Sequence, residues 1–205
     1  MSNQNVISLR PHQRARKFAI DLGMVSMLII VFAEAMVFIG MVAAFMLTRA
    51  VEGTVWPPVD QPWFPLGETA INTAALLASG ALVFRAARTW DDPEARIGPL
   101  LLSAIALGSF FLFFQGVVWF KLIRDGLSLM SSHHGQFFCL IVGVHAGHVL
   151  GALAFLGVVW VRLKPFRDED IPPRGALSRS AFSAARISWY FAVGSWPVLW
   201  LCLYL

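Results

Sequence analysis

The sequence predicts an all-α integral membrane protein, a bundle of five transmembrane helices with the N-terminus in the cytoplasm and the C-terminus outside. Three observations predict this fold. Only 14% of the 205 residues are charged and 58% are hydrophobic, whereas a soluble domain carries about 25% charged residues. The hydrophobic residues gather in five long stretches, and most arginines and lysines lie in alternate loops between them. This composition excludes a water-soluble globule, and the alternation typical of a membrane β-strand is absent.

Each stretch approaches the length of about 20 apolar residues that a helix needs to cross a bilayer. Inside hydrocarbon, every backbone donor and acceptor needs a partner within its own segment, so stretches of this length form helices. We expect a single membrane domain, residues 18–205, after a basic cytoplasmic tail, residues 1–17. The expected spans cover about residues 21–48, 69–88, 97–120, 135–162 and 183–204.

Charges mark the limits of the first two spans. Glu34 is the only charged residue between Asp21 and Arg49. The second span is short at its edges, where Glu68 and Arg85 can extend their charged ends toward water. Basic residues precede the first span, as in a signal peptide. The span is too long for one, however, and no A-x-A-like cleavage site ends a short apolar core, so we expect the first helix to be retained.

The three later spans are delimited in the same way. The third fills an interval without any charge, residues 97–120. The fourth lies between Asp125 and Arg162, and the fifth reaches the last residues of the sequence. We find no separate soluble domain, internal repeat or low-complexity segment, so one compact bundle is expected.

The distribution of basic residues predicts the orientation. Thirteen of the sixteen lysines and arginines fall in the N-terminal tail, the loop after the second span and the loop after the fourth. The other side has only Arg49, Lys121 and Arg124. The positive-inside rule therefore places the N-terminus in the cytoplasm. An odd number of spans then places the C-terminus outside.

The loop after the first span is rich in residues that suit a membrane surface. Residues 55–65 read VWPPVDQPWFP, with four prolines and two tryptophans. Proline breaks a helix there, and tryptophan is enriched at the level of the lipid headgroups. We therefore expect Trp56 and Trp63 to be interface anchors.

Glu34 and two histidines are the polar residues that most suggest a functional site. An ionised acid near the middle of a span costs roughly 2.5–3.5 kcal/mol on insertion scales, so Glu34 is expected to face protein and to be neutral or paired. His145 and His148 lie on one helix face, one turn apart, in the fourth span. Because Glu34 and His148 lie at similar depths, a hydrogen bond or ion pair between them is the hypothesis that satisfies both. The glutamate is then a proton site, a contact to a lipid headgroup or a buried hydrogen bond that sets helix register. The alternative is a protonated acid that bonds to a neighbouring helix and has no role in turnover.

A stripe of glycines lies on the same helix as the two histidines. Gly143, Gly147 and Gly151 are spaced four residues apart, a spacing that lets a second backbone approach closely. We expect this stripe to be a helix-packing surface.

The remaining polar residues predict neither a catalytic nor a metal site. Asn72, Thr73 and Gln115 lie inside spans, where interhelical hydrogen bonds are the default explanation. The following residues also lack the neighbours that a metal site needs: His133, His134, Cys139 and Cys202. A haem with two histidine ligands is not expected either, because the mid-membrane histidines lie on one helix.

Several segments, taken in order, resemble the subunit III family of cytochrome c oxidases. Residues 32–38 (FAEAMVF) resemble its glutamate-centred segment, and Trp56-Pro57-Pro58 followed by residues 66–73 (LGETAINT) is similar to its W-P-P loop and the start of its next helix. Gln115-Gly116 with Trp119, and then residues 143–149 (GVHAGHV), resemble its later segments. In the last helix, Trp189 and Trp196 match family tryptophans.

One departure from the family pattern lies in that last helix. Tyr190 and Val193 stand where the family has a histidine and an aspartate. The resemblance is to the short, five-helix bacterial form of the family, which also includes a homologue associated with nitric oxide reductase.

The resemblance implies a non-catalytic subunit of a haem-copper oxidase complex in aerobic respiration, in the bacterial inner membrane. It implies no haem or copper in this chain, and both in the catalytic subunit I beside it. In the family, two helices split from the others and leave a cleft for phospholipid. The resemblance places Glu34, with His145 and His148, near such a cleft, where it supports proton uptake.

Two other classes of function remain open from the residues alone. One is a proton or solute transporter that uses Glu34 and His148, although no inverted repeat is visible. The other is an enzyme that itself binds a quinone.

Overall fold

The computed structural model describes the five helices and short parts of the segments between them. The described residues are 22–52, 62, 64–90, 92, 95–130, 132–163 and 179–204. The expected cytoplasmic tail, Trp56 and Trp63 lie outside the described residues.

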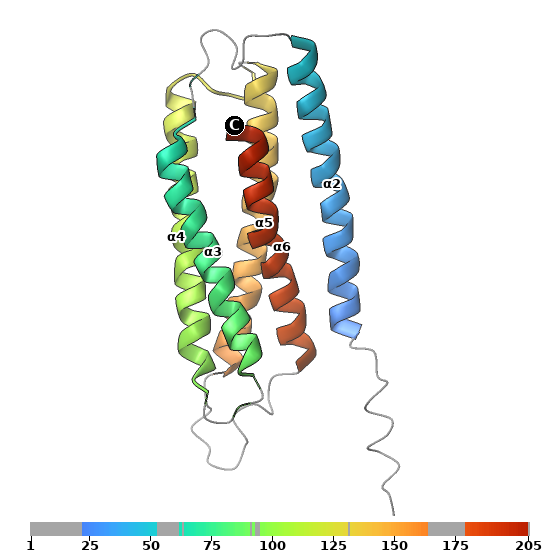
Figure 1. Ribbon diagram of the computed structural model, residues 1–205, viewed down its shortest axis with the longest axis vertical. Helices are drawn as coiled ribbons and strands as arrows, with labels where there is room; N and C mark the ends of the chain where they lie inside the picture. Colours follow the sequence, from blue (N-terminus) through green and yellow to red (C-terminus); the bar gives the residue numbers. More distant parts are fainter. Residues whose placement is uncertain are drawn as a thin grey trace, which may run out of the picture.

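All five helices run along the long axis of the molecule, and neighbours in sequence run in opposite directions (Figure 1). They are α2 (Leu22–Glu52), α3 (Leu66–Arg88), α4 (Ile97–Arg124), α5 (His133–Leu163) and α6 (Arg179–Tyr204). Each is long and apolar enough to cross a membrane. The predicted all-α fold with five membrane-spanning helices is confirmed.

Short local motifs mark where α4 ends and where α5 begins. The expected spans gave only approximate limits for these helices. After α4, Gly126 adopts φ +99°, the Leu127 N–H donates to the Leu122 carbonyl, and the Gly126 N–H donates to the Ile123 carbonyl. This is a Schellman motif, which favours glycine at the left-handed position. At the start of α5, the Ser132 hydroxyl accepts a hydrogen bond from the Gly135 N–H, as an N-cap does.

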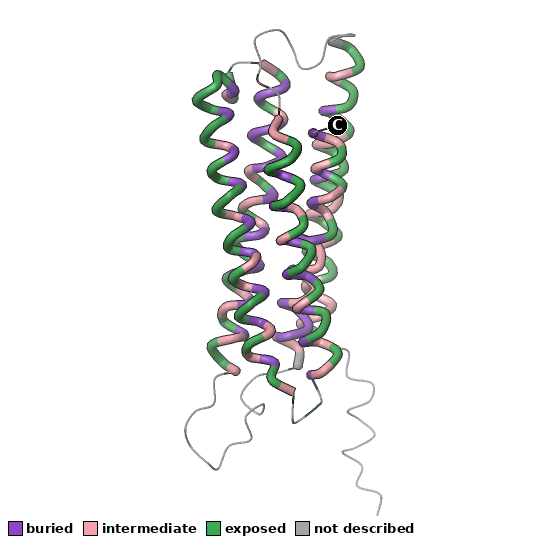
Figure 2. Tube along the Cα trace, turned by 60° about the vertical axis from the view of Figure 1, so that its left-hand side comes forward, coloured by how far each residue is buried: buried purple, intermediate pink, exposed green. Residues whose placement is uncertain are grey.

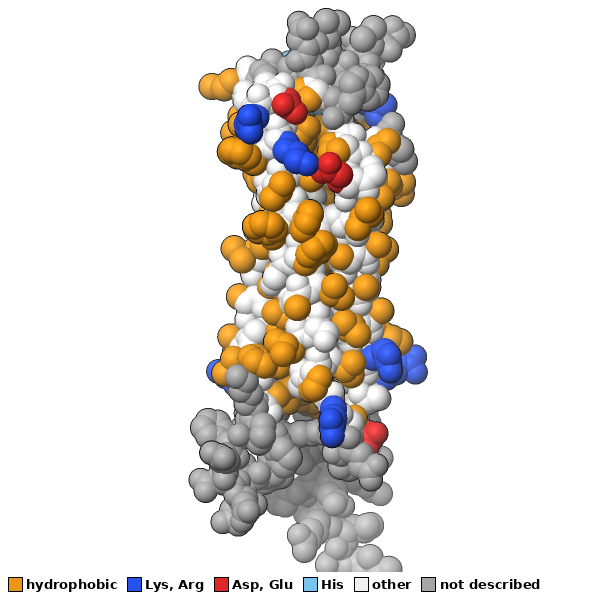
Figure 3. Space-filling view, turned by 90° about the vertical axis from the view of Figure 1, so that its left-hand side faces the viewer, with side chains coloured by type: hydrophobic (Ala, Val, Ile, Leu, Met, Phe, Trp, Pro, Cys, Tyr) orange, Lys and Arg blue, Asp and Glu red, His pale blue; other side chains and the backbone are white. Residues whose placement is uncertain are grey.

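Residues that are buried or half-buried alternate with exposed residues along each helix (Figure 2). In the face shown in Figure 3, a broad band without acidic or basic residues separates charged side chains near the two ends. At one end, Lys121 of α4 lies 2.9 Å from Glu68 of α3. Because both side chains are about half exposed, this pair contributes little to stability. The band is what a surface in contact with hydrocarbon requires.

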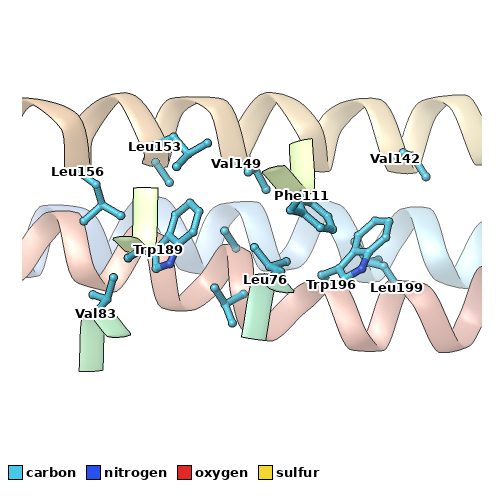
Figure 4. Close-up of a cluster of buried hydrophobic side chains, with 14 of the residues drawn as sticks. Leu76, Val83, Phe111, Val142, Val149, Leu153, Leu156, Trp189, Trp196 and Leu199 are labelled. Atoms are coloured by element: carbon cyan, nitrogen blue, oxygen red, sulfur yellow. The ribbon is translucent and has the colours of Figure 1, made fainter. Parts of the chain in front are cut away.

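The core forms around α6, where the indole rings of Trp189 and Trp196 are completely buried (Figure 4). A Cβ atom on Gly108 of α4 would lie 2.5 Å from the Trp189 ring, and one on Gly80 of α3 would lie 2.8 Å from Val193. Glycine at these two positions therefore allows α6 to approach both helices.

Three indole N–H groups of α6 donate to hydroxyl groups of α3. The donors and acceptors are Trp189 to Ser79 at 3.2 Å, Trp196 to Thr73 at 2.9 Å and Trp200 to Thr69 at 3.0 Å. In hydrocarbon these bonds satisfy the only polar atom of each indole, so they fix the register of α6 against α3.

The first helix is the least integrated part of the bundle. It lies to one side of the other four helices (Figure 1) and packs against α6 and α5 only, among the described elements. Phe38 and Phe45 are the two large side chains of α2 that are buried. The resemblance implied two helices set apart from the others, whereas here a single helix occupies that position.

Candidate functional site

A cleft of about 510 Å³ lies between α2 and α5 and touches α6. Its walls on α2 run from Met27 to Phe38, and its walls on α5 run from Val144 to Phe155. Most lining side chains are apolar, and the polar ones are Glu34, His148 and Ser188. The volume lies in the range of sites that bind small molecules.

The expected contact between Glu34 and His148 is present. The Glu34 Oε2 atom lies 2.8 Å from Nδ1 of His148. On the far side of the ring, Nε2 lies 3.2 Å from the Ser188 carbonyl oxygen. The contact therefore joins α2, α5 and α6 through one imidazole.

These partners determine how many protons the pair holds. A carbonyl oxygen only accepts hydrogen bonds, so Nε2 must carry a hydrogen to interact favourably with Ser188. Oε2 has no hydrogen bond among the described residues. A bare Nδ1 and a bare carboxylate oxygen would repel each other at 2.8 Å, so this contact is favourable only when one proton is shared between them. The pair is then either an imidazolium with a carboxylate or an imidazole with a carboxylic acid, and both forms hold the same proton. Glu34 and His148 can thus store one proton without leaving an isolated charge in hydrocarbon.

His145 lies apart from the cleft although it is on the same helix face. The side chain is buried, and its ring stacks on Trp196 with centroids 4.9 Å apart. The rings of Phe38 and Phe111 contact it edge-on. Neither ring nitrogen has a hydrogen-bond partner among the described residues. The structure therefore brings His148, and not His145, to Glu34.

The glycine stripe occupies two different environments. A Cβ atom on Gly143 would lie 3.2 Å from the Trp119 ring of α4, a close contact of the expected kind. Cβ atoms on Gly147 and Gly151 would meet nothing within 4 Å, and both residues line the cleft. The structure differs here from the expected close packing, because the cleft and not a neighbouring helix lies over these two glycines.

The polar residues expected to bond between helices do so. The side-chain amide of Asn72 in α3 donates to the backbone carbonyl of Phe111 in α4 at 3.1 Å and to the side-chain oxygen Oε1 of Gln115 at 3.4 Å. Gln115 in turn donates to the Tyr204 hydroxyl at 3.3 Å. Thr73 accepts from Trp196, as described above. These bonds stabilise the bundle at a distance from the cleft.

No group of three or more His, Cys, Asp or Glu side chains that would suit a metal ion occurs among the described residues. His134 and Cys139 are buried, and Cys202 is partly exposed.

Comparison with known proteins identifies the family to which the chain belongs. The sequence model of the family described as "Cytochrome c oxidase subunit III" matches residues 4–205. The chain belongs to the cytochrome c oxidase subunit III family. Family membership makes it a subunit of a haem-copper oxidase and a multi-pass membrane protein, in agreement with the resemblance drawn from the sequence.

Curated members of the subunit III family resemble the chain over most of its length. Cytochrome c oxidase subunit 3 of Lumbricus terrestris is 29% identical over 189 residues, which are 87% of this chain and 68% of that protein. The Synechocystis protein of the same name is 27% identical over 190 residues, 90% of this chain and 76% of its own length. A "Probable cytochrome c oxidase subunit 3" of Nocardia farcinica is 25% identical over 204 residues, which are 98% of this chain and 94% of that protein.

The segments that carry the subunit III resemblance lie on different helices and meet in the fold. Glu34 from the first segment contacts His148 from the fourth. Trp196 in the last helix bonds to Thr73 in the segment that begins α3. Sequence reasoning missed Ser188, which contributes only a backbone carbonyl. It also missed Gly80 and Gly108, whose importance depends on the large α6 side chains beside them.

Proposed function

We propose that this chain is a non-catalytic subunit III that docks beside the haem- and copper-bearing catalytic subunit I of an oxidase in the bacterial inner membrane. It stabilises that partner and supports its proton uptake through the lipid-filled cleft between α2 and α5. The observation that carries the proposal is the Glu34–His148 contact inside a bilayer-facing cleft, in a chain of this family.

The geometry suits a proton reservoir better than a simple structural ion pair. About a third of the Glu34 side chain is exposed, so it is reachable from the cleft, while His148 is nearly buried. A proton that enters the cleft meets a carboxyl group whose charge is compensated by its neighbour. A phospholipid in the cleft would separate this carboxyl from bulk water and keep the path to it short.

The proposal is tested by comparing oxygen consumption of the oxidase complex with and without this chain. The complex without the chain should begin at a rate close to that of the intact complex and then lose activity over repeated turnover, because proton supply to the catalytic subunit is impaired. Adding back the wild-type chain should restore sustained activity. Equal persistence of activity with and without the chain would contradict the proposal.

The same purified material distinguishes the alternative partners. If the chain isolates with a catalytic subunit that reduces nitric oxide and not oxygen, the complex is a nitric oxide reductase. If it isolates alone and moves protons in vesicles, it is a transporter.

A further inference from the structure

Two contacts fix the register of α3 against α6 at the end of the bundle where α3 finishes and α6 begins (Figure 1). Toward the membrane centre, a Cβ atom on Gly80 would lie 2.8 Å from Val193. Toward the membrane surface, the Trp90 ring stacks on Phe182, with centroids 4.0 Å apart and an interplanar angle of 9°. The stretches of the two helices between these contacts therefore lie side by side.

Two arginines and two aromatic rings occur between these contacts. On α3, Phe84 and Arg88 follow the glycine of the first contact by four and eight residues. On α6, Tyr190 and Arg186 precede the valine of that contact by three and seven residues. Such intervals keep side chains on one face of a helix. The two faces therefore begin at the same contact and run together toward the membrane surface.

Each arginine lies next to the aromatic side chain of its own helix. The Arg88 guanidinium lies over the Phe84 ring, 4.9 Å from the centroid. The Arg186 guanidinium is close enough to the Tyr190 hydroxyl to interact with it electrostatically. Phe84 and Arg88 are exposed, and Arg186 and Tyr190 are half-buried. All four side chains can therefore be reached from the lipid around the bundle.

Neither arginine forms an ion pair with an acidic residue among the described parts of the chain. Two guanidinium groups on facing helices repel each other, and an anion between them removes this cost. A guanidinium presents a planar fork of donors that matches the oxygens of a phosphate group. The pair of arginines therefore suits a phosphate better than a carboxylate-free surface would suggest from charge alone.

The depth of the two arginines matches the headgroup region of a bilayer. Arg88 is the last residue of α3. Arg186 lies seven residues into α6, about 10 Å along its axis, and a long basic side chain can extend its charge toward the surface. The aromatic rings lie deeper, as apolar contacts for acyl chains must.

We infer that Arg88 and Arg186 bind the phosphate of an anionic phospholipid between α3 and α6, and that the Tyr190 hydroxyl donates to the same headgroup. The acyl chains run past Phe84 and Leu77 toward the membrane centre. The lipid belongs to the leaflet at this end of the bundle, which the positive-inside rule predicts to be the cytoplasmic one. The headgroup is anionic because the two arginines bring two positive charges, whereas a zwitterionic lipid cancels its phosphate with its own amine.

This site is separate from the cleft between α2 and α5. None of its residues lines that cleft, and its binding does not require the proposed role of Glu34 in proton uptake. The inference therefore goes beyond the proposed function and can fail without it.

The test is photolabelling of the whole complex, purified in mild detergent, with a phosphatidylglycerol whose photoreactive group lies on the acyl chain next to the glycerol. A phosphatidylcholine with the same chains serves as the second probe, and mass spectrometry identifies the labelled peptides. Phosphatidylglycerol should label the adjoining ends of α3 and α6 more strongly than phosphatidylcholine. Excess unlabelled phosphatidylglycerol should suppress the labelling, whereas excess inorganic phosphate should not.

Two variants and a matched control define the site. Arg88→Gln and Arg186→Gln should each reduce phosphatidylglycerol labelling about tenfold, because each removes hydrogen bonds to a charged phosphate. Arg85→Gln is the control, since Arg85 is an exposed arginine of the same helix that lies off the face shared with α6. It removes the same charge and should label like the wild type. If Arg186→Gln lowers the yield of the complex, Arg88→Gln tests the same site from an exposed position.

Each outcome has a defined meaning. Equal labelling by the two lipids would overturn the inference, and so would equal labelling of the control and the two site variants. Suppression by inorganic phosphate would assign the site to free phosphate and overturn the lipid. Labelling that appears only after the partner subunits are removed would show that an acidic protein surface covers the arginines, which also overturns it. No turnover is measured, so the proposed subunit function is tested separately.

Discussion

At the scale of single residues, the pairing of Glu34 with His148 explains how an acid persists inside an apolar helix. The sequence predicted the pair because the two residues occur at similar depths, and the 2.8 Å contact confirms it. The sequence could not predict the third partner, the Ser188 carbonyl, because every residue has such a group and only the packing of α6 selects one. The sequence paired Glu34 with His148 but placed His145 near the cleft as well, because the two histidines differ in their neighbours and not in their residue type.

Substitution of Glu34 tests the energetic role of this pair. Glu34→Leu leaves the buried His148 Nδ1 without its partner, so it should lower the stability of the chain by about 1–3 kcal/mol. Glu34→Gln keeps a hydrogen-bonding group at the same position, so the complex should assemble normally with only a modest change in turnover. Thermal unfolding of the detergent-purified complex measures the first effect, and oxygen consumption measures the second. Loss of the whole complex in Glu34→Gln would contradict this account.

At the scale of helices, close approach depends on glycines that face large side chains and not on glycine spacing alone. The spacing of Gly143, Gly147 and Gly151 predicted a packing surface, yet two of the three lie against open space. Gly80 and Gly108 have no repeated spacing, and they meet α6 side chains closely. Spacing identifies a smooth helix face, but the neighbouring helix decides whether that face is covered.

Two glycines of α4 allow a matched test of this conclusion. Gly108→Val would force atoms into the fully buried Trp189 ring, so it should destabilise the bundle by about 1–3 kcal/mol or more. Gly116→Val, on the same helix with no atom within 4 Å of its Cβ position, should have little effect. Yield and unfolding temperature of the two purified variants measure the difference. Similar behaviour of both would contradict the packing seen at Trp189.

The attachment of α2 depends on its two buried aromatic side chains. Phe38 packs on Phe191 and His145, with ring centroids 6.0 and 6.1 Å apart. Truncating a buried phenylalanine costs about 3–5 kcal/mol, so Phe38→Ala should loosen α2 from the other helices. Limited proteolysis of α2 measures the loosening. Phe32→Ala is the control, because Phe32 is 70% exposed, and equal behaviour of both variants would contradict the role of Phe38.

At the scale of the whole molecule, composition and charge predicted the fold class because both follow from the bilayer. Apolar stretches long enough to cross hydrocarbon must be helical, so the five helices followed from residue counts alone. The packing order of the helices and the position of the cleft did not follow from residue counts, because lipid-facing and protein-facing residues are both apolar. Ile71 is 71% exposed, for example, and Leu76 on the same helix is completely buried. Only the arrangement of the neighbours distinguishes them.

The expected orientation gives a prediction for the intact cell. Met130, in the segment between α4 and α5, is 92% exposed and lies at the end of the bundle opposite Arg96. With Cys139 and Cys202 replaced by alanine, Met130→Cys should react with a membrane-impermeant thiol reagent added outside. Arg96→Cys should react only after the membrane is opened, because the positive-inside rule predicts that the basic end faces the cytoplasm. The reverse pattern would contradict the orientation.

The central claim, that this chain is a non-catalytic subunit of a haem-copper oxidase, is tested most directly by purifying the tagged chain from its native membrane in mild detergent. Mass spectrometry identifies what accompanies it, and a visible spectrum is recorded before and after the partners are removed. The account predicts a haem-copper catalytic subunit in the purified material and a colourless chain once that partner is stripped away. Isolation of the chain alone, or haem absorbance that stays with the stripped chain, would contradict it.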